Sequence, residues 1–446
     1  MLLRVILKNF LSFENEVMFD MFPNIKKTLL PTHIYRREGH VPVLKQAAIF
    51  GPNGAGKSNL VKGLDFLQSF VTQKDVLKRQ DLDRYCYRLK PVDASEPIYL
   101  AIEFEFEGQY FFYEIEVLKE AVKRETLYES FPLEDRFSLI FERKASQVEY
   151  AEGVSVDNAI VKATQTMLQN NPLSSFIALN KEFPLVQDER VEQVHRWFAE
   201  QLEVIDVHTT VPQLIDILRQ DEGLLNFMKH AVATLQLGVS GVDLNDQDFD
   251  EWAKYHTNLA KFLPNQEAST TFTIDQNDNP IFSISIENGI RKVYLLLFEQ
   301  VGRNGYVGHL DAGFQSDGTL RALMLLPAIY CAITKGKTAV VDEINSFLSH
   351  SMVRGLVGYF ANTEHSNGQL IFTTHDTELL EDKDILRSDE VWFVDKKEGA
   401  SIMYSHNDFK EHHSISMYKG YNEGRFGAIR FINLNESRRD VREAEK

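Results

Sequence analysis

The chain has 446 residues, of which 43% are hydrophobic and 25% charged, and a formal net charge of -17 at pH 7. This composition is ordinary for a globular protein with a large core, and the length predicts two or three domains. The negative charge argues against a protein that coats nucleic acid, because such binding needs clustered Lys and Arg, although a local basic groove stays open. The two cysteines, Cys86 and Cys331, match no metal or disulfide spacing, which favours a reducing cytoplasm.

No segment of the sequence predicts a secretory signal or a membrane crossing. The N-terminal residues lack a long apolar core behind a basic start. The most apolar run, residues 320–334, contains Arg321 and Pro327 and is shorter than the roughly 18 residues that a membrane helix needs. We therefore expect a cytoplasmic protein that is not fused to a membrane partner.

The first third of the chain has the pattern of strands around a glycine-rich loop. Apolar residues at helical spacing follow that loop and predict a helix over residues 59–71. Alternating residues with Glu107-Gly108 at their centre predict a β-hairpin. Strands are expected at residues 2–10, 17–19, 46–50 and 98–117, with two more in 127–150.

The middle of the chain, residues 156–262, has apolar residues at helical spacing but no heptad repeat, which predicts a compact helical insert and not a coiled-coil arm. Its acidic stretch at 243–251 is interpreted as a solvated loop. Strands then alternate with helices, which favours a parallel, doubly wound sheet. The expected strands are 270–274, 281–286, 293–298, 338–343, 369–375 and 390–395, with helices at 319–334 and after Ser346.

Residues 51–58 match the phosphate-binding loop GxxxxGK[ST] in full. The glycines let backbone amides surround a triphosphate, and the following helix adds its positive end. Lys57 would place a charge near the β- and γ-phosphates, and Ser58 would offer a hydroxyl to Mg²⁺. The expected ATP-binding residues are Gly51, Pro52, Asn53, Gly54, Ala55, Gly56, Lys57, Ser58 and Asn59.

Two later apolar strands end in polar residues, at the strand edge where parallel sheets bind ligands. In the first, Asp342 is expected to hold Mg²⁺, directly or through water, and Glu343 to polarise the attacking water. In the second, His375 is expected to reach the γ-phosphate and report its presence. ATP and Mg²⁺ are therefore the expected cofactors.

The segment SDGTLR at residues 316–321 precedes the helix that leads to the acidic strand. Ser316 and Gly318 at a helix start can bind an anion through a hydroxyl and a backbone N–H. The same residues also fit a plain helix N-cap, with Ser316 or Asp317 as the cap. The residues alone leave both interpretations open.

The ordered set GPNGAGKS, SDGTLR, VVDE and TTHD resembles the head of ABC-type ATPases, in the branch that includes DNA-repair and chromosome-maintenance ATPases. The SDGTLR variant, the opening NFLSF, the segment YEIEVLKEAVKRETLYE and the closing YNEGRFGAI resemble the OLD-like, or AAA-15, bacterial defence ATPases. That group includes the ATPase subunits of PARIS, Septu and Rlo-type anti-phage systems. The resemblance covers residues 1–150 and 270–435.

The resemblance implies an α/β ABC-ATPase head with an antiparallel β subdomain and a compact helical insert. The two halves of the head would be residues 1–150, with the phosphate loop, and 269–435, with the signature, the acidic strand and His375. Residues 151–268 would form the insert, and 436–446 a charged tail.

The resemblance also implies a homo-oligomer, at least a dimer, with composite ATP sites. In this arrangement the signature of one copy meets the γ-phosphate held by Lys57 of the other. The lid glutamine and the adenine-stacking aromatic stay unassigned. The implied residues are Ser316, Asp317, Gly318 and Thr319 in the signature and Asn345 and Ser346 in the dimer-seam loop; Gln109 and Gln147 are candidates for the lid, and Phe10 and Phe13 for adenine stacking.

Three functions remain in competition. The first is an ATPase subunit of an anti-phage system that senses a trigger, such as nucleic acid or a phage protein, and controls a separate toxic effector. The chain leaves no room for a nuclease after GRFGAI, so we expect that activity in a partner. The second is a DNA-repair or chromosome-maintenance ATPase that clamps duplex, against which the acidic charge and the missing coiled coil argue. The third is a regulatory NTPase that acts as a slow switch.

Overall fold

The computed structural model describes residues 1–74, 76–77, 82–90, 96–151, 157–205, 211–257, 270–272, 282–287, 289–363, 366–409 and 416–430. The chain divides into two compact units whose sequences interleave. The acidic-strand unit comprises Met1–Leu2, Leu30–Gln46 and Gln193–Thr373, and the phosphate-loop unit comprises Leu3–Leu29, Ala47–Glu192 and Thr374–Lys446. The domain limits expected from the sequence stay a prediction, and the boundary at 268/269 and the tail 436–446 lie outside the described residues.

A seven-stranded sheet forms one side of the phosphate-loop unit. Residues 110–117 alternate half-exposed and buried side chains, and the expected hairpin is confirmed, with Glu107 and Gly108 at φ 53° and 85° in the turn. The part expected to hold two strands after residue 127 holds three, the first of which begins earlier, at Val122. In sheet order the strands are β10 (Gln147–Tyr150), β9 (Arg136–Lys144), β8 (Val122–Phe131), β7 (Gln109–Val117), β6 (Ile98–Phe106), β1 (Leu2–Lys8) and β2 (Val17–Asp20).

The phosphate loop lies between β5 (Gln46–Phe50) and α1 (Lys57–Thr72), as the sequence predicts. Strand β19 (Val391–Lys397) pairs in parallel with β5, and β20 (Ala400–Ser405) continues antiparallel beside β19. The apolar face of α1 is buried and contacts α3 (Phe176–Glu182). The unit also contains α2 (Asn158–Asn170), the first half of α4 (Glu189–Arg196) and α11 (Met417–Asn422).

A buried ion pair joins the start of α3 to the seven-stranded sheet. Arg143 and Glu125 are both fully buried, with 3.1 Å between Arg143 Nη1 and Glu125 Oε2. Glu125 accepts hydrogen bonds from the Ser175 hydroxyl and the Phe176 amide, and Arg143 donates to the carbonyl of Pro172. Because each charged group has several partners, the pair can remain buried, and it fixes this helical segment on the sheet.

Three parallel strands lie side by side in the acidic-strand unit. They are β11 (Leu202–Ile205), β17 (Thr338–Val341) and β18 (Gln369–Thr374). In the chain, α9 (Asp317–Thr334) precedes β17, and α10 (His350–Ala361) connects β17 to β18. The α/β class and the parallel pairing are therefore confirmed. Strand β11 falls in the segment interpreted as helical. It was not predicted because its four residues are too few to show a period.

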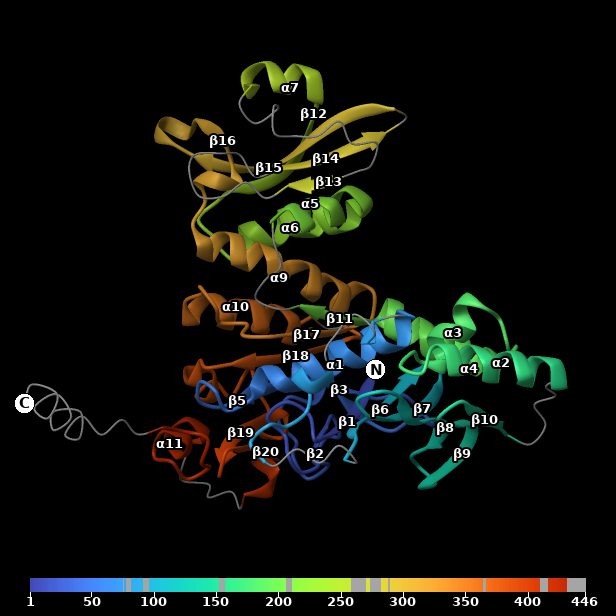
Figure 1. Ribbon diagram of the computed structural model, residues 1–446. Helices are drawn as coiled ribbons and strands as arrows, with labels where there is room; N and C mark the ends of the chain where they lie inside the picture. Colours follow the sequence, from blue (N-terminus) through green and yellow to red (C-terminus); the bar gives the residue numbers. More distant parts are fainter. Residues whose placement is uncertain are drawn as a thin grey trace, which may run out of the picture. The chain divides into compact units, whose positions relative to one another are not determined.

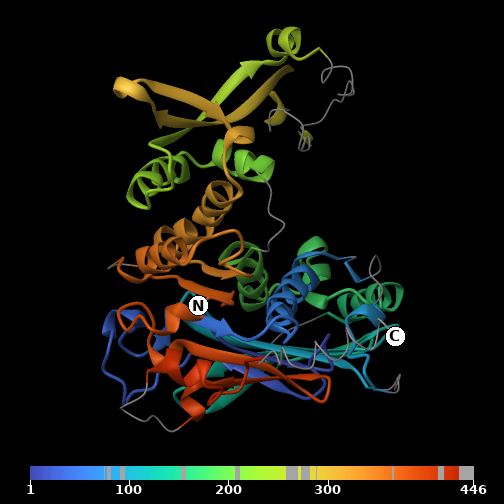
Figure 2. The same cartoon turned by 90° about the vertical axis from the view of Figure 1, so that its left-hand side faces the viewer.

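A second sheet in this unit has helices on both faces. Helix α7 (Phe249–Tyr255) contacts β12 (Gly241–Asp248) and β15 (Ile290–Val301). Helices α5 (Val211–Gln220) and α6 (Glu222–Thr234) cover the opposite face (Figure 1, Figure 2). Helix α6 also contacts α9. The strands are β12 (Gly241–Asp248), β15 (Ile290–Val301), β14 (Phe282–Glu287) and β13 (Thr270–Phe272), with β16 (Val307–Asp311) beside β15; the short β3 (Ile34–Tyr35) and β4 (Val43–Leu44) pair elsewhere in the unit.

The interpretation of residues 243–251 as a solvated loop is wrong. They lie in β12 and at the start of α7, where Phe249 and Trp252 are buried in a small core. Lysines offset the acidic side chains, with Lys292 Nζ 2.7 Å from Asp246. The charge pattern of the exposed face therefore obscured a strand. None of the helices in the described part of the chain combines the length and the apolarity that a bilayer crossing requires.

Candidate functional site

The phosphate loop follows the tight path that its glycines permit. A Cβ on Gly51 would collide with the carbonyl oxygen of Val394 in β19. Gly56 has φ 112°, and a Cβ there would collide with the hydroxyls of Ser12 and Ser401. Gly56 is also the N-cap of α1, so no side chain covers the first amides of this 16-residue helix. These amides and the helix dipole therefore suit a phosphate group.

Lys57 and His375 lie in contact inside the phosphate-loop unit. Lys57 is 5% exposed, and its ammonium donates to the carbonyl of Gly51 at 2.9 Å. The same nitrogen lies 3.0 Å from Nε2 of His375. Two residues that are 318 positions apart in sequence, each expected to meet the γ-phosphate, thus converge at one place.

Two serines that sequence reasoning missed form hydrogen bonds that hold the loop and the start of α1. Ser12 Oγ accepts a hydrogen bond from the Asn59 side chain at 2.6 Å and lies 2.6 Å from Ser401 Oγ. Ser401 also bonds the carbonyl of Ala55 through its hydroxyl and that of Ser12 through its amide. Ser12 belongs to the NFLSF segment, which could have suggested it, whereas nothing in the sequence around Ser401 indicates a role.

A cavity of about 580 Å³ adjoins this serine pair, entirely within the phosphate-loop unit. Leu11 and Tyr87 contribute apolar surface, and three basic side chains also line it, those of Arg84, Arg88 and Lys396. Phe10 and Phe13, the candidates for adenine stacking, are fully buried in the core and do not line it. The lining residues are Leu11, Ser12, Asn59, Arg84, Cys86, Tyr87, Arg88, Leu89, Lys396 and Gly399.

The closing motif YNEGRFGAI packs behind β19, the strand that meets Gly51. The Tyr404 hydroxyl donates to the carbonyl of Phe426, and Asp395 accepts from the amide of Ala428. The Tyr421 hydroxyl donates to the carbonyl of Ala428. Burial, with the nearby Asp395 charge, raises the pKa of Tyr421 to about 12, and the same two causes raise that of Tyr404. The motif therefore helps to hold β19, the strand that contacts Gly51 of the phosphate loop, in position.

The acidic pair follows β17 in the acidic-strand unit. Asp342 is 8% exposed, and its Oδ1 accepts a hydrogen bond from the Thr373 hydroxyl at 2.6 Å. Its amide donates to the carbonyl of Ile205 in β11, and its own carbonyl accepts from the buried Arg321 at 3.3 Å. Strands on both sides and helix α9 thus fix the position of this carboxylate.

Glu343 begins a turn with a left-handed backbone conformation that the sequence does not predict. Its φ is 47°, a value that costs a non-glycine residue free energy. The amide of Glu343 donates to the Thr373 hydroxyl at 2.7 Å, and its Oε2 accepts from the Ser346 hydroxyl at 3.0 Å. Asn345 and Ser346, the expected seam residues, are half-buried in this turn.

The signature segment forms the start of α9. Ser316 is the N-cap, and its hydroxyl accepts the amide of Thr319 at 3.1 Å. Ser316 and Asp317 are exposed, whereas Thr319 is buried. A Cβ on Gly318 would lie 2.9 Å from the carbonyl oxygen of Phe347, so this glycine lets α9 approach the turn that follows the acidic pair. The capping interpretation is realised in the single chain, which leaves the role toward a partner as a hypothesis.

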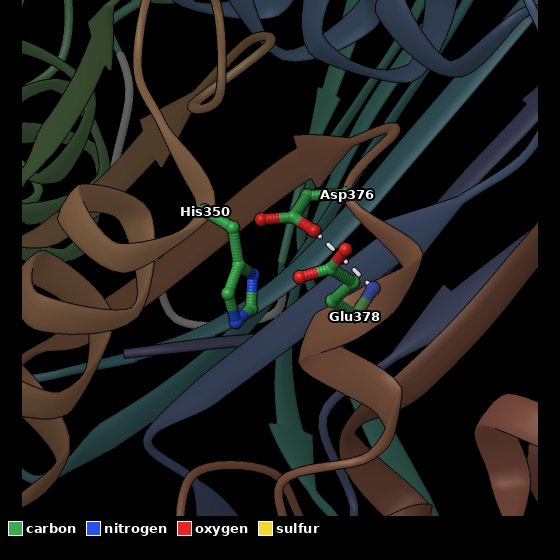
Figure 3. Close-up of side chains that lie close together, drawn as sticks. All are labelled: His350, Asp376 and Glu378. Carbon is green, nitrogen blue, oxygen red and sulfur yellow. Dashed lines mark hydrogen bonds between the residues drawn. The ribbon is translucent and has the colours of Figure 1, made fainter.

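Asp376, directly after His375, caps a short 3-10 helix, η7 (Thr377–Leu380). Its carboxylate accepts a hydrogen bond from the Glu378 amide at 3.2 Å, drawn as a dashed line in Figure 3. The last polar residue of the TTHD motif therefore orders the chain behind the histidine. Gln109 and Gln147 start strands β7 and β10 of the antiparallel sheet, and neither gains support as the lid residue.

The donor groups fit the expected magnesium ion chemically. Asp342 offers a carboxylate oxygen and Ser58 a half-buried hydroxyl, and oxygen donors of this kind suit Mg²⁺. Asp342 and Glu343 belong to the acidic-strand unit, and Ser58, Lys57 and His375 to the phosphate-loop unit. The residues expected from the motifs are therefore divided between the two units.

A family model described as "AAA domain, putative AbiEii toxin, Type IV TA system" matches residues 47–381. No curated protein matches the chain. An SMC head domain from Thermotoga maritima shares 12% identity and covers 91% of this chain and 98% of its own, with a TM-score of 0.40. An Smc head bound to the C-terminal domain of ScpA, derived from Pyrococcus furiosus, shares 13% identity and covers 95% and 98%, with a TM-score of 0.44. Similarity at this level does not define an activity.

Proposed function

The chain belongs to the AAA-domain family that residues 47–381 match, and from this premise we propose that it is the Mg²⁺-dependent ATPase subunit of a bacterial anti-phage system. The contact between Lys57 and His375 carries the proposal, because it unites two phosphate-binding side chains from distant motifs. The family description names a toxin and a toxin–antitoxin system, which supports a role in growth arrest or defence.

The phosphate-loop unit would bind the nucleotide. Backbone amides of the loop and of the first turn of α1 hold the β- and γ-phosphates, with Lys57 as the buried cation. His375 meets the γ-phosphate beside Lys57 and so distinguishes ATP from ADP. The adjoining cavity suits a base and ribose, since Arg84 or Arg88 can lie over the face of an aromatic base.

The acidic-strand unit would supply the hydrolytic groups. Bound Mg²⁺ neutralises negative charge on the phosphates, and Asp342 and Ser58 are the residues that would hold it. Glu343 accepts a proton from the attacking water, and the hydrogen bond from Ser346 orients its carboxylate. The reaction therefore needs residues of both units.

The surface around the signature supports an oligomer with composite sites. Phe314, two residues before Ser316, is 71% exposed, and Phe347, whose carbonyl approaches Gly318, is 73% exposed. Large exposed aromatic side chains beside a polar helix start are typical of surfaces that a protein partner covers. We assign this surface to a second copy, so that Ser316 and Gly318 complete the phosphate site of its partner.

Defence would follow from control of a separate toxic effector, for which a nuclease is the strongest candidate. ATP binding would close the oligomer around its trigger, a nucleic acid or a phage protein, and hold or release the effector in the cytoplasm. Assembly would therefore control the effector, because the catalytic groups of this ATPase come together only in the assembly.

The decisive experiment is affinity purification of the Glu343→Gln variant from its native host, followed by intact-mass measurement and an ATPase assay of the wild-type protein. We expect Mg²⁺-dependent hydrolysis, an assembly with at least two copies, and a second subunit. Purification that never yields a second subunit would contradict the defence role. Hydrolysis that duplex DNA stimulates, with a steep salt dependence, would favour the DNA clamp instead.

A further inference from the structure

The first residue of the TTHD motif, to which the sequence assigns no role, contacts both members of the acidic pair. Thr373 lies in β18 and is fully buried. Its hydroxyl donates to Asp342 Oδ1 at 2.6 Å and accepts from the Glu343 amide at 2.7 Å. Its carbonyl accepts from the amide of Ile344 at 3.0 Å. Three consecutive residues of the acidic turn are thus bound by a single residue of the neighbouring strand.

The two hydroxyl bonds have fixed directions. A threonine hydroxyl has one hydrogen, and an ionised carboxylate and an amide leave only one assignment, donation to Asp342 and acceptance from Glu343. The bond to Oδ1 restricts rotation of the Asp342 carboxylate and leaves Oδ2 as the oxygen that would bind the metal. The bond from Glu343 stabilises the amide of a residue whose φ of 47° is otherwise unfavourable.

We propose that Thr373 is the positioning residue for ATP hydrolysis in this chain: its hydroxyl sets the orientation of the metal-binding carboxylate and the turn that presents the general base. The inference rests on the proposed ATPase function. Thr373 lies two positions before His375 in the sequence, so the strand that carries the acidic pair's anchor continues directly into the residue assigned to the γ-phosphate.

Thr338 gives a matched control. It lies at the first position of the neighbouring strand β17, is 1% exposed, and its hydroxyl donates to the Gln369 side chain at 2.9 Å. Valine at either position keeps the shape of the side chain and removes a buried, hydrogen-bonded hydroxyl. The two variants therefore share a cost in stability, and only Thr373→Val disturbs the acidic pair.

The test compares wild type, Thr373→Val, Thr373→Ser and Thr338→Val in the full-length protein. Thr373→Val should lower kcat by about 10- to 100-fold and raise the Mg²⁺ concentration that half-saturates ATP binding, measured by calorimetry, several-fold, because residues that orient metal ligands have effects of this size. ATP affinity at saturating Mg²⁺ should change less than about twofold, since the phosphate loop is untouched. Thr373→Ser and Thr338→Val should stay within about threefold of wild type in both measurements.

A Thr373→Val protein with the kcat and the Mg²⁺ dependence of Thr338→Val would overturn the proposal. If Thr373→Val does not fold, Thr373→Ser decides: a soluble serine variant with kcat reduced tenfold or more refutes the hydroxyl role, and one with wild-type kcat and Mg²⁺ dependence supports it. Absence of ATP hydrolysis in the wild-type protein would instead remove the proposed function, so the two failures are distinguishable.

Discussion

The phosphate loop and the acidic turn solve the same problem, the placement of charged groups, in different ways. The loop relies on its backbone: Gly51 and Gly56 permit close approach, and amides at the start of α1 point outward. The acidic turn relies on side chains from elsewhere, above all the hydroxyl of Thr373. The loop's arrangement is encoded in one short segment of sequence, whereas the acidic turn needs strands that meet only in the folded protein.

This difference predicts separate failures. Substitutions in the loop should weaken ATP binding, and substitutions in the acidic turn should slow hydrolysis while ATP still binds. Three substitutions test that separation and a fourth tests the support of the strand beside the loop, from the largest expected effect to the smallest.

Glu343→Gln should lower the rate of ATP hydrolysis by about 10³-fold and leave ATP binding intact. The amide side chain keeps the shape and the bond from Ser346 but cannot accept a proton from water. Phosphate release measures the first effect and calorimetry the second. Turnover of the variant at the wild-type rate would show that Glu343 is not the general base.

Lys57→Ala should weaken ATP binding by about 100-fold, because a buried ammonium that pairs with phosphate contributes a strong charge-assisted hydrogen bond. Lys62→Ala, on the exposed face of the same helix, is the control for charge and helix stability. Equal affinities for ATP in the two variants would contradict the assignment of Lys57.

Ser316→Arg should spare ATP binding and reduce turnover by about tenfold or more, because a bulky cation at the exposed start of α9 would obstruct a partner's site. The effect should grow with protein concentration in the range where wild type assembles. Ser416→Arg, at the exposed N-cap of α11, serves as the comparison. A monomer of wild-type sequence that hydrolyses ATP at the full rate would disprove the composite site.

Tyr421→Phe should reduce the free energy of unfolding by about 1 kcal/mol at pH 8, the usual contribution of one buried hydrogen bond. The raised pKa means that folded chains hold the phenolic proton more tightly than unfolded chains. The stabilisation is therefore complete below pH 10 and is lost as the pH rises toward 12. Denaturant unfolding at pH 8 and pH 11 should show a smaller difference between wild type and variant at the higher pH. Tyr255→Phe, at an exposed position, controls for loss of a hydroxyl.

Sequence patterns were a good guide wherever one short segment carries the signal. The strand, loop and helix at residues 46–72 agree with expectation because glycine spacing and an apolar period are local properties. The strands β11 and β12 were missed for the opposite reason, since β11 is only four residues long and β12 has a charged face. Phe10 and Phe13 were close in sequence to the loop, yet packing buried them in the core.

By itself, the sequence determined the α/β class, the phosphate loop, the acidic pair and the family, because each depends on residue types at fixed spacing. Only the tertiary structure decided that His375 meets Lys57, that Ser12 and Ser401 support the loop, and that Thr373 holds the acidic turn. These partners are 30 to several hundred positions apart, as with the 389 between Ser12 and Ser401. A hydrogen bond depends on distance and angle in space, and chain order records neither.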